Sequence, residues 1–368
     1  MYRETILINI NANLPRKYFI DNIRSLMVLL VVVYHVFYLF NSVGVPKNIG
    51  DTGIPAFDGF CYFIYPWLMT IMFLVAGISA RYALQSRSEK QFAKERIQKL
   101  LIPLAGGMFL LAWINGWVAN QYVDVFEGND IPAFMKYLIL CLVIGPLWFN
   151  LELFFVSMVL IIIRKIDRRD RLWTLAGKTN VLVLLLLALP LWGSSFLLNI
   201  VITFRNGIYL FVFLTGYYFF SQDKIIGILT RFRFPLLVSS IILGIIEVYV
   251  FYGKSFVADN YLQHPLINLY AWVMMMALLG YSHQYLNQTN KAMEYIKSRS
   301  FFWYLTHFPI MSFAAYIIMS KFKFPMICNY ILLLFFGFGI TVIVCEMVRL
   351  IPVLRFLLFG IRNKSREA

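Results

Sequence analysis

Apolar stretches of roughly 20 residues alternate with short polar segments along the whole chain. A helix of about 20 apolar residues is long enough to cross the ~30 Å hydrocarbon core of a bilayer. No stretch shows the two-residue alternation of a membrane β-strand. The pattern predicts an all-α, polytopic transmembrane helical bundle of about ten spans. These lie near residues 23–42, 62–83, 101–122, 144–163, 180–200, 207–222, 235–253, 265–286, 301–320 and 327–348.

The polar segments between the spans are short, so we expect residues 1–368 to form one membrane domain. A segment at 1–22 precedes the first span, and a basic tail at 349–368 follows the last. The first 19 residues lack the apolar region of a signal peptide, and we expect the first span to remain as an anchor. Residues 134–143 are apolar and predict a short surface or re-entrant helix.

The charge distribution predicts the topology. The chain is 61% hydrophobic and 14% charged, against about 25% charged in soluble proteins. Its net charge of +15 would suit nucleic acid, but the position of the charges argues against that partner. With the N-terminus inside, all but six of the 33 Lys and Arg lie on the inner side; the six are Lys47, Lys136, Arg205, Lys254, Lys321 and Lys323. This asymmetry predicts that both termini are cytoplasmic and that most of the charge contacts anionic lipid.

Two ionisable residues of the first span, Arg24 and His35, are the strongest candidates for chemistry. Eleven residues of α-helix rise ~16–17 Å and turn about 20° past three full turns, so both side chains lie on nearly the same face. With Arg24 at the inner surface, His35 lies near mid-depth, where an ionisable group usually marks a functional site. The alternative is a histidine that only hydrogen-bonds a neighbouring helix, with Arg24 as an interface anchor.

A second basic pair, Arg96 and Lys99, precedes Pro103 at the start of the third span. Residues three apart can face the same way on a helix, and two cations there suit the phosphates of a nucleotide-like ligand. Anchoring to lipid headgroups is the alternative. The four cysteines are scattered through apolar stretches without the spacing of a metal site, so we expect no metal.

Polar residues also interrupt later spans. Trp148 and Glu152 share a helix face at the start of the fourth span. Trp148 fits an outer aromatic belt, whereas Glu152, one turn deeper, needs a cavity or a partner. His307 precedes Pro309 in the ninth span, where a kinked helix can orient a partner. A packing role is the alternative for His307.

Near the inner end of the last span, Glu346 and Arg349 are three residues apart and predict a salt bridge.

No GxSxG, P-loop or HExxH motif supplies a familiar nucleophile or metal site. His35 is therefore the best candidate for a general base, because burial disfavours the charged imidazolium and leaves a neutral ring that can accept a proton from a hydroxyl. A second polar group could fix its tautomer, but the sequence does not identify that group.

Two other classes of function remain open at this point. A proton-coupled secondary transporter of a small polar or saccharide solute would also use buried His and Glu residues and Gly/Pro interruptions. Such a transporter should show two related halves, and residues 1–180 and 181–368 show no such symmetry. A non-enzymatic scaffold would explain the topology but not the shared face of Arg24 and His35.

Several motifs occur in a fixed order along nearly the whole chain. They are Tyr18-Phe19-Ile20-Asp21-Asn22-Ile23-Arg24 with His35, Phe73-Leu74-Val75-Ala76-Gly77, the basic pair before Pro103, Leu147-Trp148-Phe149, Tyr304-Leu305-Thr306-His307-Phe308-Pro309, and Glu346 through Leu357. In these motifs the chain resembles the acyltransferase family 3 membrane proteins, and within them the glucan biosynthesis protein C branch.

The resemblance implies O-acylation of an envelope saccharide or another hydroxyl-bearing molecule, with cytoplasmic acyl-CoA as the donor substrate. It implies that His35 is the catalytic base, that Arg24 lies on the donor side, and that Arg96 and Lys99 contact CoA. Asp21, Trp148, Glu152, His307 and Glu346 are possible supporting polar residues. It also implies a bacterial inner membrane location and, from the branch, succinyl transfer, with acetyl as the other candidate.

Two departures from the family pattern stand out. The basic pair is Arg-x-x-Lys rather than Arg-x-x-Arg, and lysine loses the bidentate phosphate geometry of arginine. Ala76-Gly77 replaces the commoner Ser-Gly.

The ~16–17 Å rise from Arg24 to His35 is about the length that a pantetheine arm can span. We therefore expect the thioester to reach His35 from inside, and the acceptor to enter from outside past residues 43–61 and 123–133.

Overall fold

The computed structural model describes residues 17–45, 49–50, 53–128, 130–197, 199–201 and 204–361. Helices occupy all ten of the predicted apolar stretches. Eight helical regions in this part of the chain are long and apolar enough to cross a membrane: Tyr18–Leu39, Pro55–Ser86, Glu89–Asn120, Gly145–Ile166, Arg233–Phe251, Pro265–Tyr285, Lys291–Lys321 and Met326–Leu350. Two shorter apolar regions are Val181–Ser194 and Asn206–Phe220. The chain is therefore a polytopic helical membrane protein.

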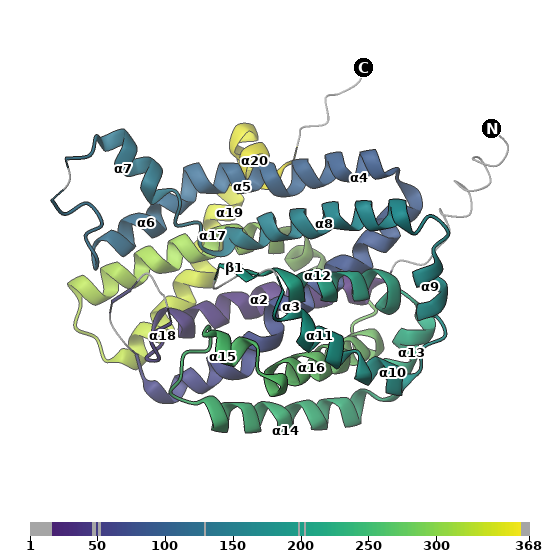
Figure 1. The fold of residues 1–368 in the computed structure, drawn as a ribbon. Helices are drawn as coiled ribbons and strands as arrows, with labels where there is room; N and C mark the ends of the chain where they lie inside the picture. The colour runs from purple at the N-terminus through teal and green to yellow at the C-terminus, as the bar shows by residue number, and fades with distance from the viewer. Residues whose placement is uncertain are drawn as a thin grey trace, which may run out of the picture.

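The eight spanning regions and the shorter apolar region Asn206–Phe220 contain the main helices of Figure 1. These are α2 (Tyr18–Leu39), α3 (Asp58–Ser86), α4 (Glu89–Arg96), α5 (Ile102–Gly107), α6 (Trp113–Asn120), α8 (Trp148–Ile166), α12 (Asn206–Thr215), α14 (Arg233–Phe251), α16 (Pro265–Tyr285), α17 (Lys291–Lys321), α18 (Met326–Phe335) and α19 (Thr341–Leu350). π-Helical turns join α4, α5 and α6 into one long helix, extend α12 and join α18 to α19; they are Ile97–Leu101, Met108–Ala112, Gly216–Phe220 and Phe336–Ile340.

Shorter elements connect these helices. They are α7 (Ala133–Leu140), α9 (Arg171–Ala176), α10 (Val181–Leu186), α11 (Ala188–Ser194), α13 (Asp223–Arg231), α15 (Asp259–Leu262) and α20 (Pro352–Phe359), with 3₁₀ turns at Pro55–Phe57 and Gly145–Leu147. Two short strands, β1 (Asn199–Val201) and β2 (Phe204–Arg205), pair antiparallel just before α12. The short helix expected near residues 134–143 is present as α7.

Three boundaries differ from the sequence prediction. The first helix begins at Tyr18, so the segment before it ends at residue 17 and not at residue 22 as predicted. Residues 1–16 of this segment lie outside the described residues. The fifth predicted span is divided into α10 and α11 and ends in the β1–β2 pair. The predicted tail at 349–368 contains helix α20, because an apolar run from Val353 to Phe359 packs against the rest of the protein.

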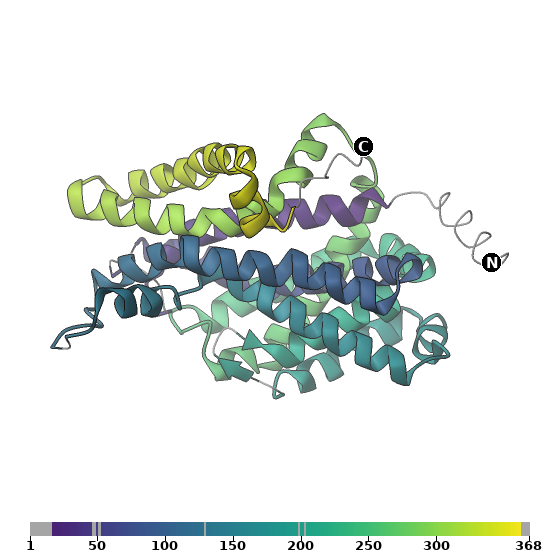
Figure 2. The same ribbon diagram turned by 90° about the horizontal axis from the view of Figure 1, so that it is seen from above.

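The long helices lie side by side, and α2 and α3 run through the middle of the bundle (Figure 1). Of the most hydrophobic part of α3, 78% is buried inside the protein, whereas for the α18–α19 helix only 22% is buried. An apolar helix that stays exposed in this way is covered by lipid in a membrane. Seen from above, α17, α18 and α19 form one side of the bundle (Figure 2).

Glycines allow α3 and α12 to cross in direct backbone contact. A Cβ added at Gly77 of α3 would meet the carbonyl oxygen of Phe213 on α12, and a Cβ added at Gly216 would meet the carbonyl oxygen of Leu74 on α3. Small residues commonly mediate such close approaches between membrane helices. The crossing fixes the spacing of two helices that both contribute residues to the central cavity described below.

Both ends of the described chain lie against the basic segment 81–99. Lys17 forms an ion pair with Asp223 and lies 5.3 Å from the ring centre of Tyr82. At the other end, Gln98 Nε2 donates to the carbonyl oxygen of Gly360 (2.8 Å), and Gly106 packs on the backbone of Leu357 in α20. The two ends therefore lie on the same side of the bundle, the side that the charge distribution predicts to be cytoplasmic.

Candidate active site

A central cavity of about 400 Å³ lies between α2, α3, α8, α12 and α17. Its volume falls within the usual range for small-molecule sites. The lining residues are Val31, Tyr34, His35, Tyr38, Tyr65, Leu68, Met69, Thr70, Leu142, Ile144, Gly145, Pro146, Trp148, Arg205, Tyr209, Tyr304 and Phe308. Tyr38, Gly145, Trp148 and Arg205 lie close to the outer ends of α2, α8 and α12 in the predicted topology. The cavity is therefore nearer to the outer side than to the inner side.

His35 reaches this cavity from α2, and its ring is held by two acceptors. Nδ1 lies 2.8 Å from the carbonyl oxygen of Val31, one turn earlier, and 3.1 Å from Nε2 of His307. A carbonyl oxygen can only accept, so Nδ1 of the neutral His35 ring carries the proton. Nε2 of His35 then keeps its lone pair. A ring nitrogen with a free lone pair in a cavity is the arrangement that a general base needs.

His307 lies behind His35 and is fully buried in α17. Its Nδ1 lies 2.8 Å from the carbonyl oxygen of Trp303, which can only accept, so this nitrogen carries the proton of the neutral ring. Nε2 of His307 is then the acceptor that faces Nδ1–H of His35. The two histidines form a dyad, and His307 is the polar group that the sequence could not identify.

The loop before α8 closes one wall of the cavity. Gly145 adopts a positive φ of 50° there, which glycine tolerates without strain. Pro146 follows it, and the hydroxyl of Tyr304 donates to the Pro146 carbonyl oxygen. This turn directs Trp148 inward, where its ring stacks on Tyr209 with 5.4 Å between the ring centres. Trp148 therefore lines the cavity, and its assignment to an outer aromatic belt is wrong.

The predicted donor-side residues lie at the inner end of the bundle and do not line the cavity. Arg24 forms an ion pair with Asp21 (2.9 Å), and its side chain is 41% exposed. Arg24 and Arg96 lie close enough to repel each other, and Arg87 contributes to the same cluster. Lys99 is instead exposed and pairs loosely with Glu95 at 3.5 Å. The structure thus places Arg24, Asp21 and Arg96 near one another and leaves Lys99 at the surface.

A larger polar cavity of about 860 Å³ opens at this inner end. Asp21 lines it together with Lys17, Arg87, Lys224 and the ring of Trp173. Cations beside an aromatic ring suit a nucleotide-like ligand, which carries phosphates and an aromatic nucleobase.

Glu152 and Glu346 do not line the central cavity. Glu152 is buried and accepts a hydrogen bond from Asn206 of α12, so it joins α8 to α12. Glu346 accepts from Arg299 (2.6 Å) and from Arg349 (3.3 Å). The predicted Glu346–Arg349 pair is confirmed, and Arg299 of α17 extends it into an interhelical cluster.

Two sets of cavity residues were not predicted from the sequence. The first set is five tyrosines, which are Tyr34, Tyr38, Tyr65, Tyr209 and Tyr304. Tyrosine is frequent in this chain, and nothing in its spacing separates these five from the rest. The second is Arg205, which was counted among the outer charges and is instead 4% exposed within the protein. Nothing in its sequence position signalled an inward orientation, since Asn206 and Gly207 separate it from the apolar run that begins at Ile208.

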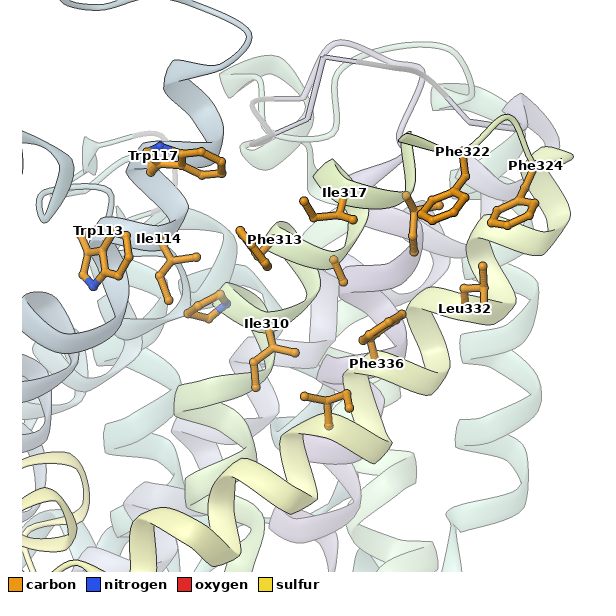
Figure 3. Close-up of a pocket in the computed structure, with 14 residues that line it drawn as sticks. Trp113, Ile114, Trp117, Ile310, Phe313, Ile317, Phe322, Phe324, Leu332 and Phe336 are labelled. Atoms are coloured by element: carbon orange, nitrogen blue, oxygen red, sulfur yellow. The ribbon is translucent and has the colours of Figure 1, made fainter. Parts of the chain in front are cut away.

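A third cavity, of about 770 Å³, is of a different kind. Figure 3 shows that side chains of α6, α17, α18 and the π-helical turn after α18 line it, among them Trp113, Trp117, Phe313 and Phe336. Every lining residue is apolar or aromatic, and several face outward from the bundle. A groove of this composition suits lipid chains and offers no group for acid–base chemistry.

Comparison with known proteins assigns the family. The profile of the acyltransferase family 3, described as an acyltransferase domain, matches residues 17–346. The chain belongs to this family and is a membrane acyltransferase.

Among curated proteins, the chain is 25% identical to the glucans biosynthesis protein C of Salmonella paratyphi B over 96% of its own length and 98% of that protein. It is 24% identical, with the same coverage, to the proteins of that name from Salmonella paratyphi A and Salmonella agona. No solved structure gives a significant match.

Proposed function

We propose that this protein transfers an acyl group from cytoplasmic acyl-CoA to a hydroxyl of an envelope saccharide, with the reaction in the central cavity. The observation that carries the proposal is the orientation of His35: Nδ1 faces the Val31 carbonyl and His307, which leaves Nε2 as a base. The site lies in an integral membrane protein of an acyltransferase family. The membrane would be the bacterial inner membrane.

In the proposed reaction, His35 Nε2 accepts the proton of the acceptor hydroxyl as the oxygen attacks the thioester carbonyl. The C–S bond breaks, the new ester bond forms, and the proton passes from His35 to the departing CoA sulfur. The ester and free CoA are the products. During the reaction His35 is a cation, and the carbonyl of Val31 and Nε2 of His307 stabilise it by accepting from Nδ1–H.

The negative charge on the thioester oxygen also needs a donor. Tyr34 lines the same cavity, and its buried hydroxyl has no hydrogen-bond partner in the described part of the chain. We assign it as a donor to this oxygen.

The donor would bind at the inner end. Arg24 and Arg96 supply positive charge for the CoA phosphates, and the inner polar cavity with Arg87 and Trp173 lies beside them. Because α2 is one unbroken helix, Arg24 and His35 are separated by ~16–17 Å along its axis. A pantetheine arm can cover that distance between the helices.

The acceptor would enter from the outer side, where the cavity lies nearest the surface. The relatives are named for glucan biosynthesis, which supports a glucan as the acceptor class. Acetyl and succinyl groups are both candidates for the transferred group, since a cavity of about 400 Å³ does not distinguish them by size.

The test uses membranes that contain the wild-type protein or the variants Arg24→Ala and His35→Ala. Acetyl-CoA and succinyl-CoA are supplied in turn with a glucan acceptor, and free CoA and labelled glucan are followed. Arg231→Ala and His283→Ala are matched controls, since neither residue lines the central cavity or the inner polar cavity, and neither belongs to the Arg24–Arg96 cluster. We expect CoA release and labelling in the wild type and in both controls, and loss in both test variants. An active His35→Ala protein would refute the role of His35, and a wild type that releases no CoA would refute acyl transfer from CoA.

A further inference from the structure

Among the described residues that line the central cavity, Arg205 of β2 carries the one fixed positive charge. The side chain is buried, and it lines the same cavity as His35. It lies close enough to Tyr65 and Tyr209, which also line the cavity, to interact electrostatically with their hydroxyl groups. A guanidinium group is charged at every physiological pH, so this charge cannot be removed by loss of a proton.

The hydrogen bonds of Arg205 are few and long. Nη2 donates to the side-chain oxygen of Asn268 at 3.3 Å and to the carbonyl oxygen of Leu262 at 3.5 Å. Nε is buried and has no hydrogen-bond partner among the residues that the structure describes. Buried polar groups in proteins are nearly always hydrogen-bonded, so an unpaired N–H of a buried cation indicates a missing partner.

No carboxylate compensates the charge within ion-pair distance among the described residues. Two buried acids of the bundle have other partners: Glu152 accepts from Asn206, and Glu247 accepts from the hydroxyl of Tyr261 at 2.6 Å. A buried cation without an ion-pair partner is costly. Arginine N–H groups match the two oxygens of a carboxylate or phosphate in geometry as well as in charge.

We propose that Arg205 binds a carboxylate or phosphate carried by one of the two substrates, in the cavity where His35 acts. This inference rests on the proposed function and adds a substrate class to it: one of the reacting molecules is an anion near the reacting atoms. The anion is either the far end of the acyl group, as in a dicarboxylic acid bound to CoA through one carboxyl, or a charged substituent of the acceptor.

The test compares wild type with Arg205→Gln and Arg205→Lys for four substrate pairs. The donors are acetyl-CoA and succinyl-CoA, and the acceptors are a neutral glucan and the same glucan carrying carboxylates. Lys254→Gln is the control, because it removes an outer-side positive charge that does not line the cavity.

We expect Arg205→Gln to lower kcat/KM about 10- to 100-fold for pairs that contain the recognised anion, and Arg205→Lys to retain part of the activity. A loss confined to succinyl-CoA assigns the anion to the acyl group. A loss confined to the carboxylated glucan assigns it to the acceptor. An equal loss for all four pairs, or no loss, would overturn the proposal.

A binding measurement keeps this inference separate from the proposed reaction. The melting temperature of the detergent-purified protein is measured with monomethyl succinate, inorganic phosphate or neutral dimethyl succinate. We expect an anion to stabilise the wild type and His35→Ala, but not Arg205→Gln. This result would support the anion site even if the wild type transferred no acyl group. Equal stabilisation of Arg205→Gln, or no stabilisation of the wild type by either anion, would refute the site.

Discussion

Replacement of His307 tests whether the two histidines act together. The variant His307→Ala leaves His35 with the Val31 carbonyl at 2.8 Å but removes the acceptor at 3.1 Å. The lost hydrogen bond matters most when His35 is a cation. A hydrogen bond to a charged group contributes ~1.5–3 kcal/mol, which corresponds to roughly a 10- to 100-fold fall in kcat. Loss of His35 itself should cost about 10²- to 10⁴-fold, as for a general base.

The assay is CoA release under saturating donor, for His35→Ala, His307→Ala and the double variant. Residues that act as one unit show non-additive losses, so the double variant should be no slower than His35→Ala. His307→Phe keeps a ring in the buried space and should lose as much activity as His307→Ala. Thr306→Ala is the control, because this neighbouring hydroxyl bonds only the Phe302 carbonyl of its own helix. Additive losses, or full activity in His307→Phe, would refute the dyad.

Three further predictions concern the donor site, the carbonyl donor and the helix packing. Arg24→Ala and Arg96→Ala should each raise KM for acyl-CoA about tenfold by loss of a phosphate contact, while exposed Lys99→Ala changes it less than about twofold; equal effects of all three would contradict the cluster. Tyr34→Phe should lower kcat about 10²-fold with little change in KM, measured by steady-state kinetics, and an unchanged kcat would exclude the hydroxyl as the donor to the thioester oxygen. Gly77→Ala places a methyl group against a backbone carbonyl of α12 and should destabilise the protein by ~1–3 kcal/mol. Thermal unfolding in detergent checks this, and an unchanged melting temperature would contradict the close crossing.

The sequence predicts the helices well for a physical reason. A span in lipid must form its backbone hydrogen bonds within itself, as a helix does, and its side chains must be mostly apolar. A long apolar run in the sequence therefore marks a helix. For the same reason Arg24 and His35 could be placed on one helix face, and α2 is indeed unbroken between them. The fifth span was less predictable, since the break after Leu186 depends on how α10 and α11 pack against their neighbours.

The contacts between spans could not be predicted. His35 and His307 are 272 residues apart and meet only because α2 packs against α17. Arg205 was counted as an outer charge, because the positive-inside rule assigns a residue to a side and does not distinguish a surface arginine from one folded inward. Trp148 was misassigned because the turn at Gly145 and Pro146 decides which way its helix begins.

The close crossing of α3 and α12, where Gly77 and Gly216 each lie against the backbone of the other helix, bears on how such a protein can acquire a new substrate. No side chain separates the two backbones at this crossing, so repacking of side chains cannot change their spacing. Tyr65 and Thr70 project from α3, and Tyr209 projects from α12, into the cavity. Replacement of these side chains alters the size and polarity of the cavity while its backbone frame stays in place. Point substitutions can therefore diversify what is transferred without disturbing the helix that carries the base.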